Sequence, residues 1–205
     1  MKACKHVNER LVRILVDKGV DVNKADRYGN TPLILASYYN NENIVNYLIE
    51  KGADVHKENI YGNTALLEAC KEKHETIIQR LIENGAEVNI ENKDNDTPLL
   101  IACKYDHIPL LDYFIEKGAY IHREDRSMHT VMEYLTIANN KNLIEILNEK
   151  LKKLNNPEDP PLHRPCRDDN EHWVKEFITA IGKEEINALD SFGYNPLTIA
   201  CKKWQ

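Results

Sequence analysis

One short segment of the chain carries residue types that could hold a metal ion. It reads HRPCRDDNEH and contains His163, Cys166 and His172. His163 and Cys166 are three residues apart and could share one face of a helix, and imidazole and thiolate are ligands that zinc prefers. A structural zinc site is closed by four protein ligands, and a fourth is missing here. We therefore expect no metal at this segment.

Two pairs of neighbouring carboxylates, Asp168–Asp169 and Glu184–Glu185, lie in stretches that read as turns and loops. Paired carboxylates act as acid and base where a desolvated setting separates their pKa values, and nothing in the sequence suggests such a setting. The sequence also lacks G-x-G-x-x-G, G-x-x-x-x-G-K-[ST], G-x-S-x-G and H-E-x-x-H. It thus predicts a protein that is not an enzyme and that binds no cofactor.

The elements that would position any functional side chain are set by an internal repeat of 33 residues. The segment GNTPLILAS, which begins at Gly29, recurs as GNTALLEAC from Gly62 and as NDTPLLIAC from Asn95. The register is marked by threonines at Thr31, Thr64, Thr97 and Thr130. A period of this length is typical of a solenoid, in which each repeat buries its apolar face against its neighbours.

Residues 26–58 show how one repeat is expected to fold. Thr31 suits a helix N-cap, and Pro32 suits the first helical position, where its missing N–H costs nothing. Asn40 suits the tight turn that follows this short helix, since asparagine tolerates left-handed dihedrals. Gly52 suits the left-handed end of a second helix. The second helix should bury an apolar stripe, which in the first two repeats comprises Leu11, Val12, Leu15 and Val16, then Ile44, Val45, Leu48 and Ile49.

These residues resemble the ankyrin repeat, whose signature reads T-P-L-H-x-A at this period. The resemblance implies an all-α solenoid of helix-turn-helix units with short β-hairpin arms. The histidine of the signature is absent from the central repeats, where Ile34, Leu67 and Leu100 replace it. We expect the stack to be disrupted near 148–161, where the prolines of NNPEDPP cannot continue a helix.

The resemblance predicts three segments in the chain. Residues 1–147 form ankyrin repeats, 148–161 an irregular connector, and 162–205 one further repeat and a terminal half repeat. Within the first segment we expect a partial first repeat, then repeats at 26–58, 59–91 and 92–124, and a degenerate fifth repeat at 125–147. Because both ends fall within a repeat, we expect the chain to be a piece of a longer array.

Composition and charge restrict the classes of partner. The formal net charge of −6 argues against nucleic acid and anionic membranes, which require a basic face. No apolar run approaches the roughly 18 residues of a membrane helix, and the N-terminus lacks a secretory signal. Stacked repeats place equivalent cysteines roughly 8–10 Å apart, too far for a disulfide. We therefore expect unpaired thiols and a cytoplasmic, reducing compartment; the cysteines concerned are Cys4, Cys70, Cys103, Cys166 and Cys201.

In ankyrin arrays, the turn tips and the exposed side of the first helices form a concave surface that recognises other proteins. Mapped onto this sequence, the resemblance selects residues in the second, third and fourth repeats. They are Arg27, Tyr28, Asn30, Tyr38, Tyr39, Ile60, Tyr61, Asn63, Lys71, Glu72, Lys93, Asp94, Asp96, Lys104 and Tyr105. We expect the four tyrosines of the second and third repeats to form the anchor, because tyrosine is enriched among binding hot spots.

The sequence therefore predicts a non-enzymatic scaffold that binds a partner protein. An alternative is that the chain is the targeting or regulatory segment of a larger enzyme or secreted effector whose catalytic part lies outside it. We expect a monomer, with head-to-tail association of copies as the alternative.

Overall fold

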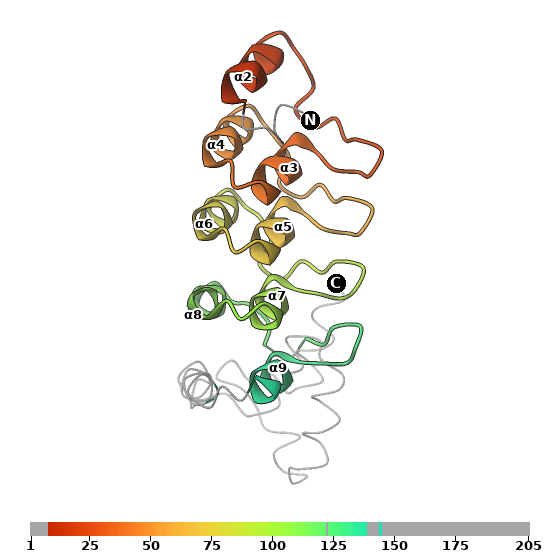
Figure 1. The fold of residues 1–205 in the computed structure, drawn as a ribbon, viewed down its shortest axis with the longest axis vertical. Helices are drawn as coiled ribbons and strands as arrows, with labels where there is room; N and C mark the ends of the chain where they lie inside the picture. The colour runs from red at the N-terminus through yellow and green to blue at the C-terminus, as the bar shows by residue number, and fades with distance from the viewer. Residues whose placement is uncertain (1–7, 122, 139–143, 145–205) are drawn as a thin grey trace, which may run out of the picture. The chain divides into compact units, whose positions relative to one another are not determined.

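The computed structural model describes residues 8–121, 123–138 and 144 (Figure 1). The chain divides into two compact units, residues 1–131 and residues 132–205. The first unit contains nearly all of the described residues. The predicted connector at 148–161 and the predicted repeats at 162–205 lie outside the described residues.

Short helices make up the described part of the chain, which contains no β-strand. Their bounds are α2 Glu9–Asp17, α3 Pro32–Tyr38, α4 Glu42–Glu50, α5 Ala65–Lys71, α6 Glu75–Glu83, α7 Pro98–Lys104, α8 Ile108–Glu116 and α9 Val131–Ile137. Within the first unit, α3, α5 and α7 form an inner column, and α4, α6 and α8 lie on one side of it (Figure 1). The predicted arms project from the other side as hairpin-shaped turns.

Threonine caps begin the inner helices, as the repeat predicts. The Thr31 hydroxyl oxygen accepts a hydrogen bond from the backbone N–H of Ile34 at 3.2 Å, and Thr97 caps α7 in the same way at 3.2 Å. Residues 33–37 of α3 are all buried, because α4 covers this helix on one side and α5 stacks below it. The aliphatic residues that replace the histidine of the signature, Ile34, Leu67 and Leu100, are all buried.

The tight turns between paired helices also follow the prediction. Asn40 has a φ of 56°, and Lys73 and Asp106 occupy the same left-handed region at the equivalent positions. Gly52 ends α4 with a φ of 82°, and its N–H donates to the carbonyl oxygen of Ile49 at 3.0 Å. A right-handed helix cannot continue through a left-handed residue, so these positions fix where each helix ends.

The outer helices bury most of the predicted apolar stripe in the complete repeats but little of it in the first. Ile44, Val45 and Leu48 are buried in α4. In α2, Val12 is buried, whereas Leu11 and Leu15 stay exposed. The prediction that α2 buries its whole stripe is therefore wrong. α2 packs against α4 on one face, and its other apolar positions remain in solvent.

Candidate protein-binding surface

Each turn tip in the first unit is built around one polar side chain at its base. In the third repeat, the Asn59 Oδ1 atom accepts hydrogen bonds from the backbone N–H groups of Tyr61 and Asn63, both at 3.0 Å. The equivalent residues Asp26, Asn92 and Asp125 make the same pair of bonds in their own repeats. Such side-chain acceptors hold a turn in one conformation, since they satisfy backbone groups that would otherwise bind water.

Backbone hydrogen bonds join each tip to the next. The N–H of Ile60 donates to the carbonyl oxygen of Tyr28 at 3.0 Å, and Lys93 donates to Tyr61 at 3.1 Å. Arg126 donates to Asp94 at 2.8 Å. We refer to these three bonds as the rungs. They fix the tips of four successive repeats relative to one another.

Side-chain amides connect the second, third and fourth repeats beneath the rungs. The Asn59 Nδ2 atom donates to Asn30 Oδ1 and to Glu68 Oε1, each at 3.1 Å. One repeat further on, Asn92 Nδ2 donates to Asn63 Oδ1 at 2.9 Å. An amide both donates and accepts, so each asparagine holds its own turn and also bonds to the repeat before it. We call these two contacts the amide junctions.

Carboxylates replace the amides between the fourth and fifth repeats. Asp96 and Asp125 stand where Asn63 and Asn92 stand one repeat earlier, and a carboxylate cannot donate. The Lys104 ammonium lies between them, in contact with Asp96 and 2.6 Å from Asp125 Oδ2. Burial alone would lower the pKa of Lys104, but its hydrogen bonds to Asp125 and Asp96 raise it above the ordinary value. We call this arrangement the ionic junction.

Three residues expected to touch a partner belong instead to these junctions. Asn63 is 3% exposed and Asp96 is 9% exposed, which leaves their side chains little surface for a partner. Lys104 is half-buried, and its ammonium is held by two carboxylates. Asn63 and Lys104 bond to the following repeat, and Asp96 bonds to Lys104 within its own repeat. We therefore treat them as supports of the surface.

Most of the other predicted residues are exposed and lie on adjacent repeats. Tyr28 and Tyr61 occupy neighbouring tips, and the Arg27 guanidinium stacks on the Tyr28 ring at 4.6 Å. Tyr38 and Tyr39 end α3 with their ring centroids 4.9 Å apart, edge to face. The exposed or half-buried members of the predicted set are Arg27, Tyr28, Asn30, Tyr38, Tyr39, Ile60, Tyr61, Lys71, Glu72, Lys93, Asp94 and Tyr105.

The ends of two adjacent inner helices carry Tyr38 and Glu72. The negative charge of Glu72, at the end of α5, is the largest cause of a raised pKa at Tyr38, at the end of α3, and burial adds to it. Tyr38 therefore stays a neutral hydrogen-bond donor over the physiological range.

A family model described as ankyrin repeats, in three copies, matches residues 1–59 and 52–125. The chain belongs to the ankyrin-repeat family. Ankyrin repeats are generally protein–protein interaction modules, and the family is typically non-catalytic. None of the curated proteins compared with the chain matches it.

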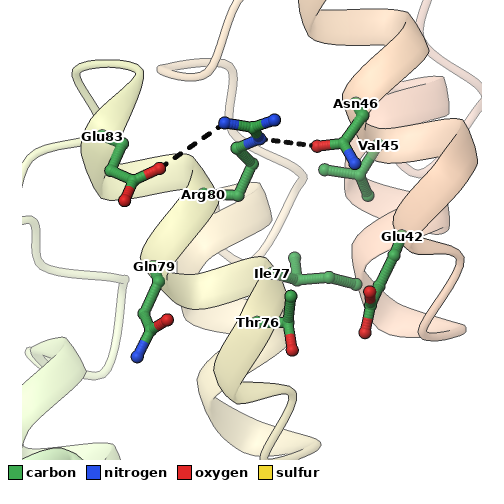
Figure 2. Close-up of a pocket in the computed structure, with 8 residues that line it drawn as sticks. All are labelled: Glu42, Val45, Asn46, Thr76, Ile77, Gln79, Arg80 and Glu83. Carbon is green, nitrogen blue, oxygen red and sulfur yellow. Dashed lines mark hydrogen bonds and ion pairs between the residues drawn. The ribbon is translucent and has the colours of Figure 1, made fainter.

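The ankyrin array also has a groove on its outer side, between α4 and α6 (Figure 2). Arg80 crosses it, with its Nε atom donating to Asn46 Oδ1 at 2.7 Å and its guanidinium 3.6 Å from Glu83. The volume of about 190 Å³ is below the roughly 300–1,000 Å³ of small-molecule sites. The groove is therefore smaller than a typical small-molecule site.

The two cysteines in the described part of the chain are unpaired. Cys70 and Cys103 are free, as predicted, and burial raises the pKa of both thiols, that of Cys103 to about 12. No group of three or more histidine, cysteine or acidic side chains within residues 8–121, 123–138 and 144 could hold a metal. The segment with His163, Cys166 and His172 lies outside these residues. In the same described stretches, no helix is long and apolar enough to cross a membrane.

Proposed function

We propose that this ankyrin array is a non-enzymatic scaffold that binds another protein on its concave surface, formed by the turn tips and the ends of the inner helices. Tyr28, Tyr38, Tyr39 and Tyr61 form the anchor, and Arg27, Ile60, Lys93 and Tyr105 extend the surface to either side. The three junction residues, Asn63, Asp96 and Lys104, hold it in place from beneath.

The observation that carries this proposal is the set of rungs between tips. Association costs free energy for every loop and side chain that must be ordered, so a surface ordered beforehand binds more tightly for the same contacts. Here each tip is fixed twice, by its polar base residue and by a rung to its neighbour. Tyrosine adds large contact area with few rotatable bonds. The free thiols of Cys70 and Cys103 support a reducing, cytoplasmic setting for this scaffold.

The test is affinity capture with the whole chain as bait. A variant in which Tyr28, Tyr38, Tyr39 and Tyr61 are all alanine is compared with the unchanged protein. Hot-spot truncations of this kind cost about 2 kcal/mol or more each, so partners should be lost from the eluate. The matched control replaces exposed outer-helix residues, Thr76, Gln79 and Glu83, with alanine and should keep every partner. Equal recovery with the tyrosine variant, once circular dichroism shows intact helices, would overturn the proposal.

A further inference from the structure

In each tip, one residue directly follows the polar base residue, and these residues form a column of cations and one apolar side chain along the array. Its members are Arg27, Ile60, Lys93 and Arg126, one from each of four successive repeats and all exposed. The backbone N–H groups of the last three are the donors of the rungs. The spacing between members is therefore set by the stack rather than by flexible loops.

Two cations in this column have no internal counter-charge. Among the described residues, neither Arg27 nor Lys93 forms an ion pair, and Arg27 instead stacks on Tyr28. Arg126 differs, because its guanidinium lies 3.6 Å from Asp94. A chain with a net charge of −6 thus displays two cations without an ion-pair partner, two repeats apart, on tips that are held by hydrogen bonds.

An apolar side chain separates the two cations. Ile60 is 46% exposed, and Tyr61 beside it is 60% exposed. Exposed aliphatic and aromatic side chains between two free cations are complementary to a ligand with a central apolar group and an acid on either side.

The spacing of repeats, together with an apolar side chain midway between the two acids, favours one conformation of such a ligand. Helices of neighbouring repeats pack roughly 8–10 Å apart, so the two cations are separated by roughly 16–20 Å. A polyproline II segment has three residues per turn and rises about 3.1 Å per residue, which places every third side chain on one face about 9 Å apart. A β-strand advances by a similar distance over three residues but turns the middle side chain to the opposite face.

We infer that this column binds a polyproline II segment of a partner protein, in which two carboxylates six residues apart flank an apolar side chain. One carboxylate pairs with Arg27, the apolar group packs on Ile60 and Tyr61, and the second carboxylate pairs with Lys93. This inference rests on the proposed function and specifies the chemistry of the partner. A nucleic acid is the less suited occupant, because the chain as a whole is acidic.

A labelled synthetic peptide tests the inference by fluorescence anisotropy with the whole chain. The peptide is proline-rich, with glutamates six positions apart and a leucine midway between them. We expect saturable binding that weakens about threefold to tenfold when Arg27→Gln and Lys93→Gln are combined, as exposed ion pairs contribute modestly. The control combines Lys24→Gln with Lys57→Gln, which removes the same charge from the arms and should leave binding unchanged.

Two further peptides make the test specific. A version with glutamine for both glutamates, and one with the glutamates five positions apart, should both bind as weakly as the original peptide binds the Arg27→Gln, Lys93→Gln variant. The inference would be overturned if either altered peptide bound as tightly as the original peptide, or if the original peptide showed no saturable binding. It would also be overturned if the Lys24→Gln, Lys57→Gln control lost as much affinity as the Arg27→Gln, Lys93→Gln variant. Tighter binding of a single-stranded oligonucleotide that depends on the same two cations would also overturn it. If affinity capture depends on the tyrosines but not on Arg27 and Lys93, the proposed function stands and this inference fails.

Discussion

The amide junctions and the ionic junction hold the same backbone with different chemistry. In both, a polar base residue accepts two backbone N–H groups, and a rung of 2.8–3.1 Å joins the tips above it. Beneath the rung, Asn92 donates directly to Asn63, whereas Asp96 and Asp125 require Lys104 between them. Asp125 lacks the N–H donor that Asn92 supplies one repeat earlier. Lys104, at the end of α7, supplies a cation in its place.

The comparison shows which partners each kind of junction needs. An asparagine pair needs no cation, because each amide carries both a donor and an acceptor, and the remaining donor of Asn63 bonds to Glu68 at 2.9 Å. An aspartate pair depends on a third residue, since two buried carboxylates repel each other and neither can donate. The two junctions should therefore respond differently to loss of a cation or of a donor.

The largest effect is expected at the ionic junction. Lys104→Met should lower the free energy of unfolding by about 3 kcal/mol, because it leaves two largely buried carboxylates without their cation. Lys71→Met removes the equivalent lysine one repeat earlier, where the described residues include no ion-pair partner for it. That control should shift stability by less than about 0.5 kcal/mol in urea denaturation. If Lys104→Met and Lys71→Met lowered the free energy of unfolding by similar amounts, the ionic junction would not contribute to stability.

The pH dependence of the same variant follows from the raised pKa of Lys104. A raised folded-state pKa means that the stabilisation is present below the unfolded lysine value of about 10.4 and is lost as pH rises above it. The difference in unfolding free energy between Lys104→Met and the unchanged protein should thus stay constant from pH 7 to 9. A difference that shrinks within that range would contradict the assignment.

The amide junction can be broken by removing its donor. Asn92→Asp keeps the two accepted backbone bonds but places a carboxylate oxygen against Asn63 Oδ1. We expect a loss of about 1–3 kcal/mol, the cost of an unsatisfied buried group. Asn95→Asp, three residues away on the exposed turn, is the control and should be nearly neutral, because aspartate also tolerates its φ of 59°. Equal effects would show that amide pairing is not what connects these repeats.

Substitutions at one turn position should have smaller effects on stability. This position is Gly62 in the third repeat and Met128 in the fifth. Gly62 has a φ of 76°, and an added Cβ would lie 2.9 Å from the backbone nitrogen of Lys93, so Gly62→Ala should destabilise by at least about 1 kcal/mol. Met128 holds the equivalent place in the fifth repeat with a φ of 62°. Met128→Gly should stabilise by about 0.5–1 kcal/mol, because relief of strain exceeds the extra chain entropy. A loss of stability in thermal melts of Met128→Gly would show that this turn is not strained.

The smallest effect is expected at the exposed ion pair above the ionic junction. Arg126 and Asp94 lie 3.6 Å apart with most of their side-chain surface in solvent. Arg126→Gln should change the unfolding free energy by less than about 0.5 kcal/mol, since water and salt screen such pairs. A loss approaching that of Lys104→Met would mean that the exposed charges matter as much as the buried ones.

The sequence was sufficient for the helices and for the exposure of most residues of the proposed surface. Thr31 and Thr97 cap helices where the period placed them, and the stripe of α4 is buried. These features depend on local preferences and on a periodic apolar pattern, both of which are readable from one repeat. The turn of the fifth repeat reads as degenerate without its glycine, yet Met128 adopts the left-handed conformation there.

The junctions were not predicted, because they depend on the neighbouring repeat. Asn63 and Asp96 read as exposed turn residues, and only stacking reveals that their polar atoms face Asn92 and Lys104. A signal was nevertheless present in the sequence. Aspartate or asparagine recurs every 33 residues at the base of each tip, at Asp26, Asn59, Asn92 and Asp125. Both residue types can accept hydrogen bonds from backbone N–H groups, so their recurrence could have indicated a shared structural role.

Hydrogen exchange at the rungs tests the central claim most directly, because it reports on the ordering of the tips without any partner. The amides of Ile60, Lys93 and Arg126 donate across repeats and should exchange as slowly as amides of the inner helices. NMR of the whole chain can follow each of them. Exchange of these three amides at the rate of an unstructured peptide, with the inner helices still protected, would contradict the account of a surface ordered before binding.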